Sequence, residues 1–159
     1  MLEITFKDFY ECDYSNDALY ELYVMKNGLG DALYVGISKQ GIWSRWFGWN
    51  GHILATDKFM IGESPVGQKI VDHLPDSWNW LIQLWTLDDC IAFCADMLNP
   101  NGTYDIHWLE PFMIQKIRPI LNEIYNINPG KDTTPISKRE TERKKLLDKV
   151  YRDVFEKKK

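Results

Sequence analysis

The stretch from Tyr23 to Gly36, YVMKNGLGDALYVG, decides the fold. Two short apolar segments flank a polar, glycine-rich loop, a pattern that predicts a β-hairpin. Each predicted strand carries one tyrosine, Tyr23 in the first and Tyr34 in the second. In such a hairpin the two phenols would lie near each other on adjacent strands. The segment from Gly41 to Phe47 has the apolar spacing of a helix, which would bring Arg45 towards them.

The rest of the chain predicts an α+β fold, with a small, mainly antiparallel three-stranded sheet flanked by helices. The expected strands are residues 19–25, 33–37 and 78–85, and residues 2–6 alternate as a short edge strand would. The further expected helices are residues 65–73, 86–98 and 105–117, the second with Thr86 as its N-cap. Residues 8–17 and 48–64 are expected to be irregular.

Length and charge predict one domain with an appendage. We expect a body of residues 1–136 and a charged C-terminal helical extension of residues 137–159. Residues 1–137 hold nine basic and 18 acidic side chains, a net charge of −9, whereas residues 138–159 hold ten basic and five acidic ones. A protein that binds nucleic acid through its phosphates needs a basic surface, so the acidic body argues against nucleic-acid binding. The tail would either hold such a backbone or form a solvated helix with i, i+4 ion pairs.

Cellular location follows from what the sequence lacks. No apolar run is long enough to cross a membrane, and the segment MLEITF has no secretory signal character. The three cysteines, Cys12, Cys90 and Cys94, form an odd set, which predicts a reducing, cytoplasmic compartment. Cys90 and Cys94 lie four apart on an expected helix, where we expect core residues rather than a zinc site, because no second cysteine pair accompanies them.

The ordered motifs resemble the signature of the GIY-YIG endonuclease family. Glu21-Leu22-Tyr23 corresponds to the first motif and Tyr34-Val35-Gly36 to the second, with the tyrosines 11 positions apart. Arg45 matches the arginine of the family's next helix, and Glu110 matches its metal-binding glutamate. Pro119-Ile120-Leu121-Asn122 is similar to the family's Pro-x-Leu-Asn segment. The resemblance spans about residues 19–122 and implies a GIY-YIG-like nuclease domain within residues 1–136.

This resemblance implies a metal-dependent endonuclease that hydrolyses DNA phosphodiester bonds. Glu110 would hold one Mg²⁺ or Mn²⁺ ion, and Arg45 would bind the scissile phosphate with its planar, always charged guanidinium. Tyr34 is the favoured base, and Tyr23 would position the attacking water. A phenol has a pKa of about 10, so a nearby cation must lower that pKa before the group can serve as a base.

Three further residues, Lys39, His52 and Asn122, are candidates for substrate binding. Lys39 follows the second motif and would contact phosphate or shift the protonation equilibrium of the tyrosine. His52 is a candidate proton carrier. Asn122 would contact the substrate or support the site. One departure from the family pattern is Glu21, which replaces a glycine. Its carboxylate would repel phosphate unless it points to the other face of its strand.

Each of these residue types also has an ordinary structural explanation. The tyrosines would pack within the sheet, the arginine and glutamate would be solvated charges, and Asn122 would end a helix or turn. The tryptophans Trp43, Trp46 and Trp49 would either stack on unpaired bases or pack a helix on the sheet. The alternatives to a nuclease are therefore a non-catalytic GIY-YIG-like module that binds nucleic acid or protein, and an unrelated α+β interaction domain.

Overall fold

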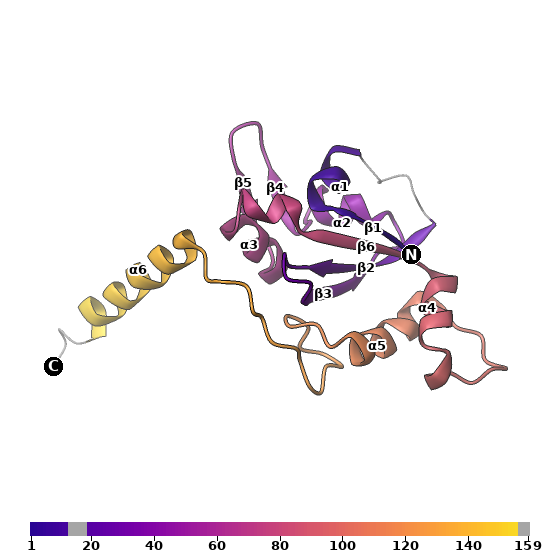
Figure 1. The fold of residues 1–159 in the computed structure, drawn as a ribbon. Coiled ribbons are helices and arrows are strands. Elements are labelled where there is room, and N and C mark those ends of the chain that lie inside the picture. Colours follow the sequence, from indigo (N-terminus) through magenta and orange to yellow (C-terminus); the bar gives the residue numbers. More distant parts are fainter. Residues whose placement is uncertain (13–18, 156–159) are drawn as a thin grey trace.

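The computed structural model describes residues 1–12 and 19–155, which surround an antiparallel sheet (Figure 1). The sheet has four strands in the order β1-β6-β2-β3. They are β1 (Leu2–Thr5), β2 (Tyr20–Lys26), β3 (Ala32–Ile37) and β6 (Leu81–Thr86). The predicted α+β class is confirmed. The predicted count of three strands is wrong, because residues 2–5 pair along β6, from Leu2 opposite Leu84 to Thr5 opposite Leu81.

The predicted hairpin is formed by β2 and β3, and β2 is a central strand between β3 and β6. Tyr23 lies opposite Gly36, and Met25 lies opposite Tyr34. Residues directly opposite each other share a face of the sheet, and so do residues two apart on one strand. Tyr23 and Tyr34 therefore point to the same face. The turn is closed by Asn27, whose backbone N–H donates to the carbonyl oxygen of Asp31 at 3.0 Å.

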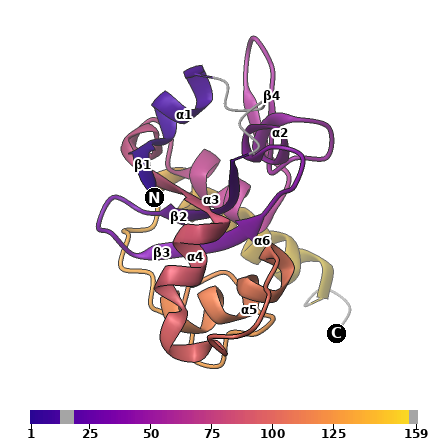
Figure 2. The same cartoon turned by 90° about the vertical axis from the view of Figure 1, so that its right-hand side faces the viewer.

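Helices cover both faces of the sheet, which Figure 2 shows nearly edge-on. We call the side of Tyr23 the tyrosine face; it is covered by α1 (Phe6–Cys12), α2 (Ile42–Phe47) and α3 (Pro65–Asp72). We call the opposite side the aliphatic face; it is covered by α4 (Leu87–Phe93) and α5 (Ile106–Ile117). Each face buries its own apolar cluster, so the sheet separates two cores.

Two segments that the sequence predicts to be irregular form regular elements. Residues 6–12 are the helix α1, because Phe6, Phe9 and Tyr10 have the i, i+3, i+4 spacing of one apolar face. Residues 13–18 of that expected irregular segment lie outside the described residues. Within residues 48–64, β4 (Ile53–Ala55) and β5 (Met60–Gly62) pair as a second, antiparallel hairpin. Three-residue strands are too short to show a clear alternation in sequence.

Two predicted boundaries also shift. The third predicted strand begins at Leu81 rather than at residue 78, because Asp76–Asn79 form a 3₁₀ helix directly after Pro75. The predicted helix of residues 86–98 is helical to Phe93 and continues as a 3₁₀ turn, Ala95–Met97. Its predicted N-cap is confirmed, since the Thr86 hydroxyl accepts from the backbone N–H of Asp89 at 3.1 Å.

The cysteine pair belongs to the aliphatic core. Cys90 and Cys94 are free thiols with no exposed surface, and the Cys94 Sγ lies 3.4 Å from the Met113 Sδ. Burial raises the pKa of the Cys90 thiol to about 12, so the group is a packing residue at neutral pH. In the described part of the chain no group of three or more His, Cys, Asp or Glu side chains could hold a metal ion.

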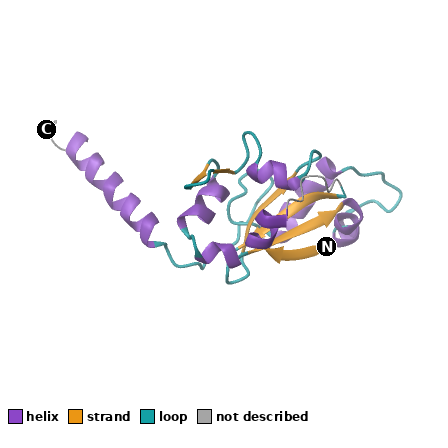
Figure 3. Cartoon of the chain, turned by 90° about the horizontal axis from the view of Figure 1, so that it is seen from above, coloured by secondary structure: helices purple, strands orange, loops and turns teal. Residues whose placement is uncertain are grey.

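The C-terminal helix α6 (Lys138–Phe155) extends away from the rest of the molecule, as the view from above shows (Figure 3). The segment before it, residues 131–137, lies against the body. The Asp132 carboxylate forms an ion pair with the Lys69 Nζ at 2.6 Å, and the Thr133 backbone N–H donates to the Asp31 carboxylate at 3.1 Å. None of the described helices is both long enough and apolar enough to cross a membrane.

Candidate functional site

The phenol of Tyr23 crosses directly over Gly36 on the neighbouring strand. A Cβ atom at residue 36 would lie 2.3 Å from the Tyr23 Oη and 2.4 Å from its Cζ. Such distances are far below van der Waals contact, so only glycine fits beneath the ring. Gly36, the glycine of the quoted hairpin stretch that lies in a strand, is therefore explained by the position of Tyr23.

A chain of hydrogen bonds holds the buried end of this phenol. The Tyr23 Oη lies 2.6 Å from the Nε2 of His52, and the His52 Nδ1 lies 2.6 Å from the Ser64 Oγ. Ser64 is the N-cap of α3, and its hydroxyl also accepts from the backbone N–H of Gly67 at 3.1 Å. Burial, and then the nearby charge of Arg45, lower the pKa of His52 to about 3. At neutral pH the ring is therefore uncharged, with one nitrogen donating and the other accepting.

Tyr34 stands beside Tyr23 at the same site but reaches solvent. The two rings have centroids 6.1 Å apart, and the Tyr34 ring lies 5.5 Å from that of His52. Burial raises the pKa of both phenols, most strongly that of the fully buried Tyr23. Both tyrosines consequently keep their protons at neutral pH. Of the two, the half-buried Tyr34 is the one with access to a ligand in solvent.

Arg45 and Glu110 both act on this tyrosine pair. The charge of Arg45 lowers the pKa of Tyr23 and Tyr34, and the charge of Glu110 raises both. Both effects are electrostatic, and α5, which carries Glu110, packs on the aliphatic face of the sheet. The ring contact joins Tyr23 and Tyr34, and α2 with Arg45 covers the same face, whereas no hydrogen bond or ion pair in the described part of the chain joins Glu110 to these three residues.

Glu110 lies half-buried on α5. Burial raises its pKa, an effect that the nearby His107 partly offsets. Its carboxylate has no hydrogen bond or ion pair to any other described residue. A carboxylate that is partly desolvated and free of protein partners suits a hard cation or a polar ligand. The donor set therefore fits one divalent ion held by one protein ligand, with the remaining positions left to water and substrate oxygens.

The two basic candidates are exposed. Arg45 lies in the last turn of α2, and its Nη1 donates to the carbonyl oxygen of Asn50 at 3.4 Å. Lys39 lies just beyond β3 with its side chain in solvent. Neither side chain forms an ion pair with any other described residue, so both are available to an anionic ligand.

Asn122 supports the outer edge of the sheet. Its Oδ1 accepts from the Val35 N–H and its Nδ2 donates to the Val35 carbonyl oxygen, each at 2.9 Å. The Asn122 side chain therefore makes with Val35 of β3, next to Tyr34, the two hydrogen bonds that a paired strand would make. The geometry matches the supporting role that the sequence analysis considered. Its amide is engaged with the backbone, whereas a direct contact with substrate would need at least one of these bonds to open.

Glu21, the acidic departure from the family pattern, acts on the opposite side of the sheet. The register between β2 and β6 shifts between Tyr20 and Leu22, which breaks the regular alternation at residue 21. Its charge raises the pKa of Cys90 on the aliphatic side, whereas it has no such effect on either tyrosine.

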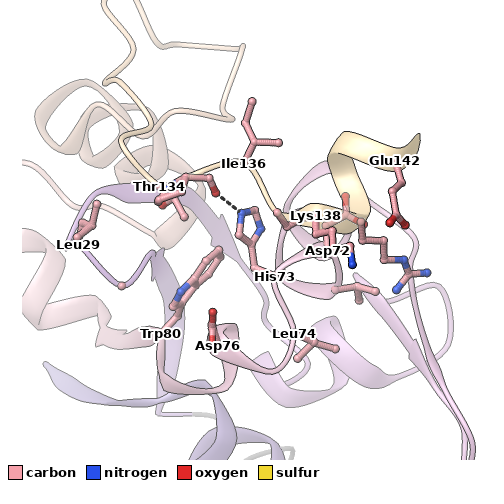
Figure 4. A pocket seen from close by; sticks show the side chains of 15 residues that line it. Leu29, Asp72, His73, Leu74, Asp76, Trp80, Thr134, Ile136, Lys138 and Glu142 are labelled. Atoms are coloured by element: carbon pink, nitrogen blue, oxygen red, sulfur yellow. Dashed lines mark hydrogen bonds between the residues drawn. The ribbon is translucent and has the colours of Figure 1, made fainter. Parts of the chain in front are cut away.

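A hollow of the described surface lies apart from the tyrosine site. It has a volume of about 730 Å³ and is lined by the hairpin turn, the end of α3 and the segment leading into α6 (Figure 4). The rings of His73 and Trp80 form part of its wall, and His73 also contacts the Pro135 carbonyl oxygen at 2.9 Å. None of the four proposed catalytic residues lines this hollow.

Comparisons with protein-family models, curated proteins and solved structures found no match. The assignment of a function therefore rests on the residues themselves and on their geometry.

Sequence reasoning missed Ser64 as part of the site. The dipeptide Ser64-Pro65 is a readable signal for a helix start, since serine is a preferred N-cap and proline suits the first helical turn. That signal predicts the cap. It does not reveal that the same hydroxyl also holds His52, which is 12 residues away in the chain.

Proposed function

We propose that this protein is a metal-dependent endonuclease of the GIY-YIG type that hydrolyses DNA phosphodiester bonds. The observation that carries the proposal is the joint action of Arg45 and Glu110 on the pKa values of Tyr23 and Tyr34. The guanidinium lies on α2 and the carboxylate on α5, and both charges influence the proton affinity of the two phenols in the hairpin. Their order along the chain is also the one that the family resemblance implies.

The exposed Arg45 binds the scissile phosphate. Its guanidinium offers several donors in one plane and stays charged at every physiological pH. Glu110 is the ligand for Mg²⁺ or Mn²⁺, and this ion, when bound, supplies positive charge to the phosphate and to the departing 3′ oxygen. Lys39 adds a second positive charge at the same edge of the sheet.

The attacking water must lose a proton as its oxygen forms a bond to phosphorus and the bond to the 3′ oxygen breaks. The Tyr34 Oη is the solvent-accessible group that would take part in this transfer. As a raised pKa keeps both phenols protonated, Tyr34 acts as a base only when added positive charge lowers that pKa. Tyr23 is buried with its hydroxyl bonded to His52, so it supports the neighbouring Tyr34 ring instead of contacting the water, and Ser64 fixes the direction of the His52 ring.

Nicking of supercoiled plasmid in Mg²⁺ or Mn²⁺ tests the proposal. Glu110→Gln keeps the shape of the side chain and removes its charge, and Arg45→Lys keeps the charge and removes the planar fork. We expect each to reduce nicking at least a hundredfold, the scale on which the loss of one electrostatic stabiliser acts. Glu123→Gln, which changes an exposed acid outside the site, is the matched control and should nick as the wild type does.

A second candidate is a module of the same fold that binds nucleic acid without cutting it. The raised pKa of both phenols and the net charge of −9 in residues 1–137 favour this reading. Binding that weakens with salt, together with intact plasmid in every metal condition, would select this candidate over the nuclease. Absence of both binding and nicking would leave an interaction domain of another kind.

A further inference from the structure

The three tryptophans near α2 have different surroundings. Trp46 has no exposed surface and packs against the rings of Phe6 and His52, with centroid distances of 5.3 and 4.6 Å. Trp43 packs on Phe47 at 5.1 Å, and its indole N–H donates to a backbone carbonyl. Trp49 is 95% exposed and contacts no other described ring. Core packing therefore explains two of the indoles and leaves the third unexplained.

The exposure of Trp49 is imposed by its backbone. The Gly48 N–H donates to the Ser44 carbonyl oxygen at 2.8 Å, and the Gly51 N–H donates to the Gly48 carbonyl oxygen at 3.0 Å. Asn50 adopts a left-handed conformation, with φ of 56°, which turns the chain sharply. A Cβ atom at Gly51 would lie 2.6 Å from a backbone oxygen of α2. This tightly folded loop holds the indole outwards.

The same loop joins two groups of the proposed site. Arg45 donates to the carbonyl oxygen of Asn50, next to Trp49 in the chain. The loop ends at His52, whose backbone N–H donates to the Arg45 carbonyl oxygen at 3.1 Å and whose ring contacts Tyr23. Trp49 therefore lies in the short loop that connects Arg45 to His52, and the Arg45 guanidinium contacts that loop at Asn50.

Building on the proposed function, we propose that Trp49 is a stacking platform for an unpaired base next to the scissile phosphate. The substrate class is then DNA with a single-stranded element, such as a flap or gap, rather than fully paired duplex. An indole stacks on any base through its π face, whereas a paired base in a duplex has both faces already covered. The acidic body supports this choice, since a long track of phosphate contacts would be unfavourable on a surface of net negative charge.

The test is a binding titration in EDTA, where cleavage is suppressed, with labelled oligonucleotides at one fixed, low salt concentration. The probes are a paired duplex and the same duplex carrying a short single-stranded flap. Trp49→Ala should weaken binding of the flap substrate by about 5- to 150-fold, which is about 1–3 kcal/mol, and leave the duplex unchanged. Trp49→Phe keeps a π face and should retain most of the affinity.

Trp108 provides the matched control. It is another exposed tryptophan, at 67%, and lies two residues before Glu110 on α5. Successive helix residues turn by about 100°, so Trp108 points to the far side of the helix from Glu110. Trp108→Ala should bind both probes as the wild type does. An equal loss for Trp108→Ala and Trp49→Ala would overturn the proposal.

The outcomes separate the two proposals. If Trp49→Ala binds each probe with the same affinity as the wild type does, the stacking platform is overturned, and the nuclease proposal is unaffected. A flap preference that depends on Trp49, with neither the plasmid nor the flap substrate cut when Mg²⁺ or Mn²⁺ is added, supports the platform and overturns the nuclease. Failure of the wild type to bind either probe overturns the platform, and nicking in Mg²⁺ or Mn²⁺ then decides the nuclease separately.

Discussion

The two faces of the sheet carry different kinds of core. The aliphatic face is filled by Leu, Val, Ile, Met and Cys side chains from the strands and from α4 and α5, with Trp85 at its margin. The tyrosine face is rich in aromatic rings and contains the buried Tyr23–His52–Ser64 chain. Apolar side chains tolerate exchange when volume is kept, whereas a buried polar chain depends on every partner. We infer that the core of the aliphatic face mainly stabilises the fold, although α5 on this face also carries Glu110, and that the tyrosine face depends on its individual polar partners.

The largest expected effect on stability lies on the aliphatic face. Met113 is fully buried there, and Met113→Ala leaves a cavity, which should lower the free energy of unfolding by about 2–5 kcal/mol. Urea denaturation measures this loss. Nicking per folded molecule should stay unchanged. Leu146→Ala on α6, where the side chain is 62% exposed, should change stability by less than about 0.5 kcal/mol. A specific loss of activity in Met113→Ala would contradict the division between the faces.

A smaller loss of stability with a larger loss of function is expected at Gly36. The added Cβ in Gly36→Ala would displace the Tyr23 phenol and break its bond to His52. Overpacking of this kind should cost about 1–3 kcal/mol. Nicking should nevertheless fall to the level of the Glu110→Gln variant. Both quantities are compared at a temperature where the variant is folded.

Gly30 provides the control for this glycine. It has a φ of 87° and nothing within 4 Å of an added Cβ. Gly30→Ala should therefore cost about 1 kcal/mol through its backbone alone and retain nicking. Full activity in Gly36→Ala would show that the position of Tyr23 is irrelevant to the chemistry.

The smallest effect is a pH dependence that arises from His52. Its pKa is about 3 in the folded protein and 6.5 in the unfolded chain, so between these values the unfolded chain binds more protons. Stability must fall as pH decreases through this window, by at most about 1.4 kcal/mol per pH unit for one group. Urea midpoints between pH 7 and pH 5 measure the slope.

His52→Gln removes the titrating group and can still bond Tyr23 through its amide. This variant should show a flatter dependence in the same window. The comparison isolates His52 from Glu110, whose raised pKa contributes a slope of the opposite sign. If the urea midpoints of variant and wild type change equally with pH, the tyrosine face does not keep His52 uncharged.

Local signals were sufficient for much of the fold. The glycine-rich turn between two apolar segments predicted the β2–β3 hairpin, and Thr86 with its following aspartates predicted the start of α4. The α1 helix and the β4–β5 hairpin were not predicted, because short elements carry too little periodicity. The fourth strand was undercounted for another reason: Leu2–Thr5 becomes part of the sheet only by pairing with β6, about 80 residues away.

The candidate site divides in the same way. The sequence by itself determined which chemical groups are present, in what order, and that Tyr23 and Tyr34 lie on paired strands, because a hairpin is a local structure. Only the tertiary structure decided that Arg45 and Glu110 act on the same phenols and that His52 and Ser64 hold Tyr23 from beneath. These contacts join residues far apart in the chain. Their positions depend on how helices pack on a sheet, which no local pattern specifies.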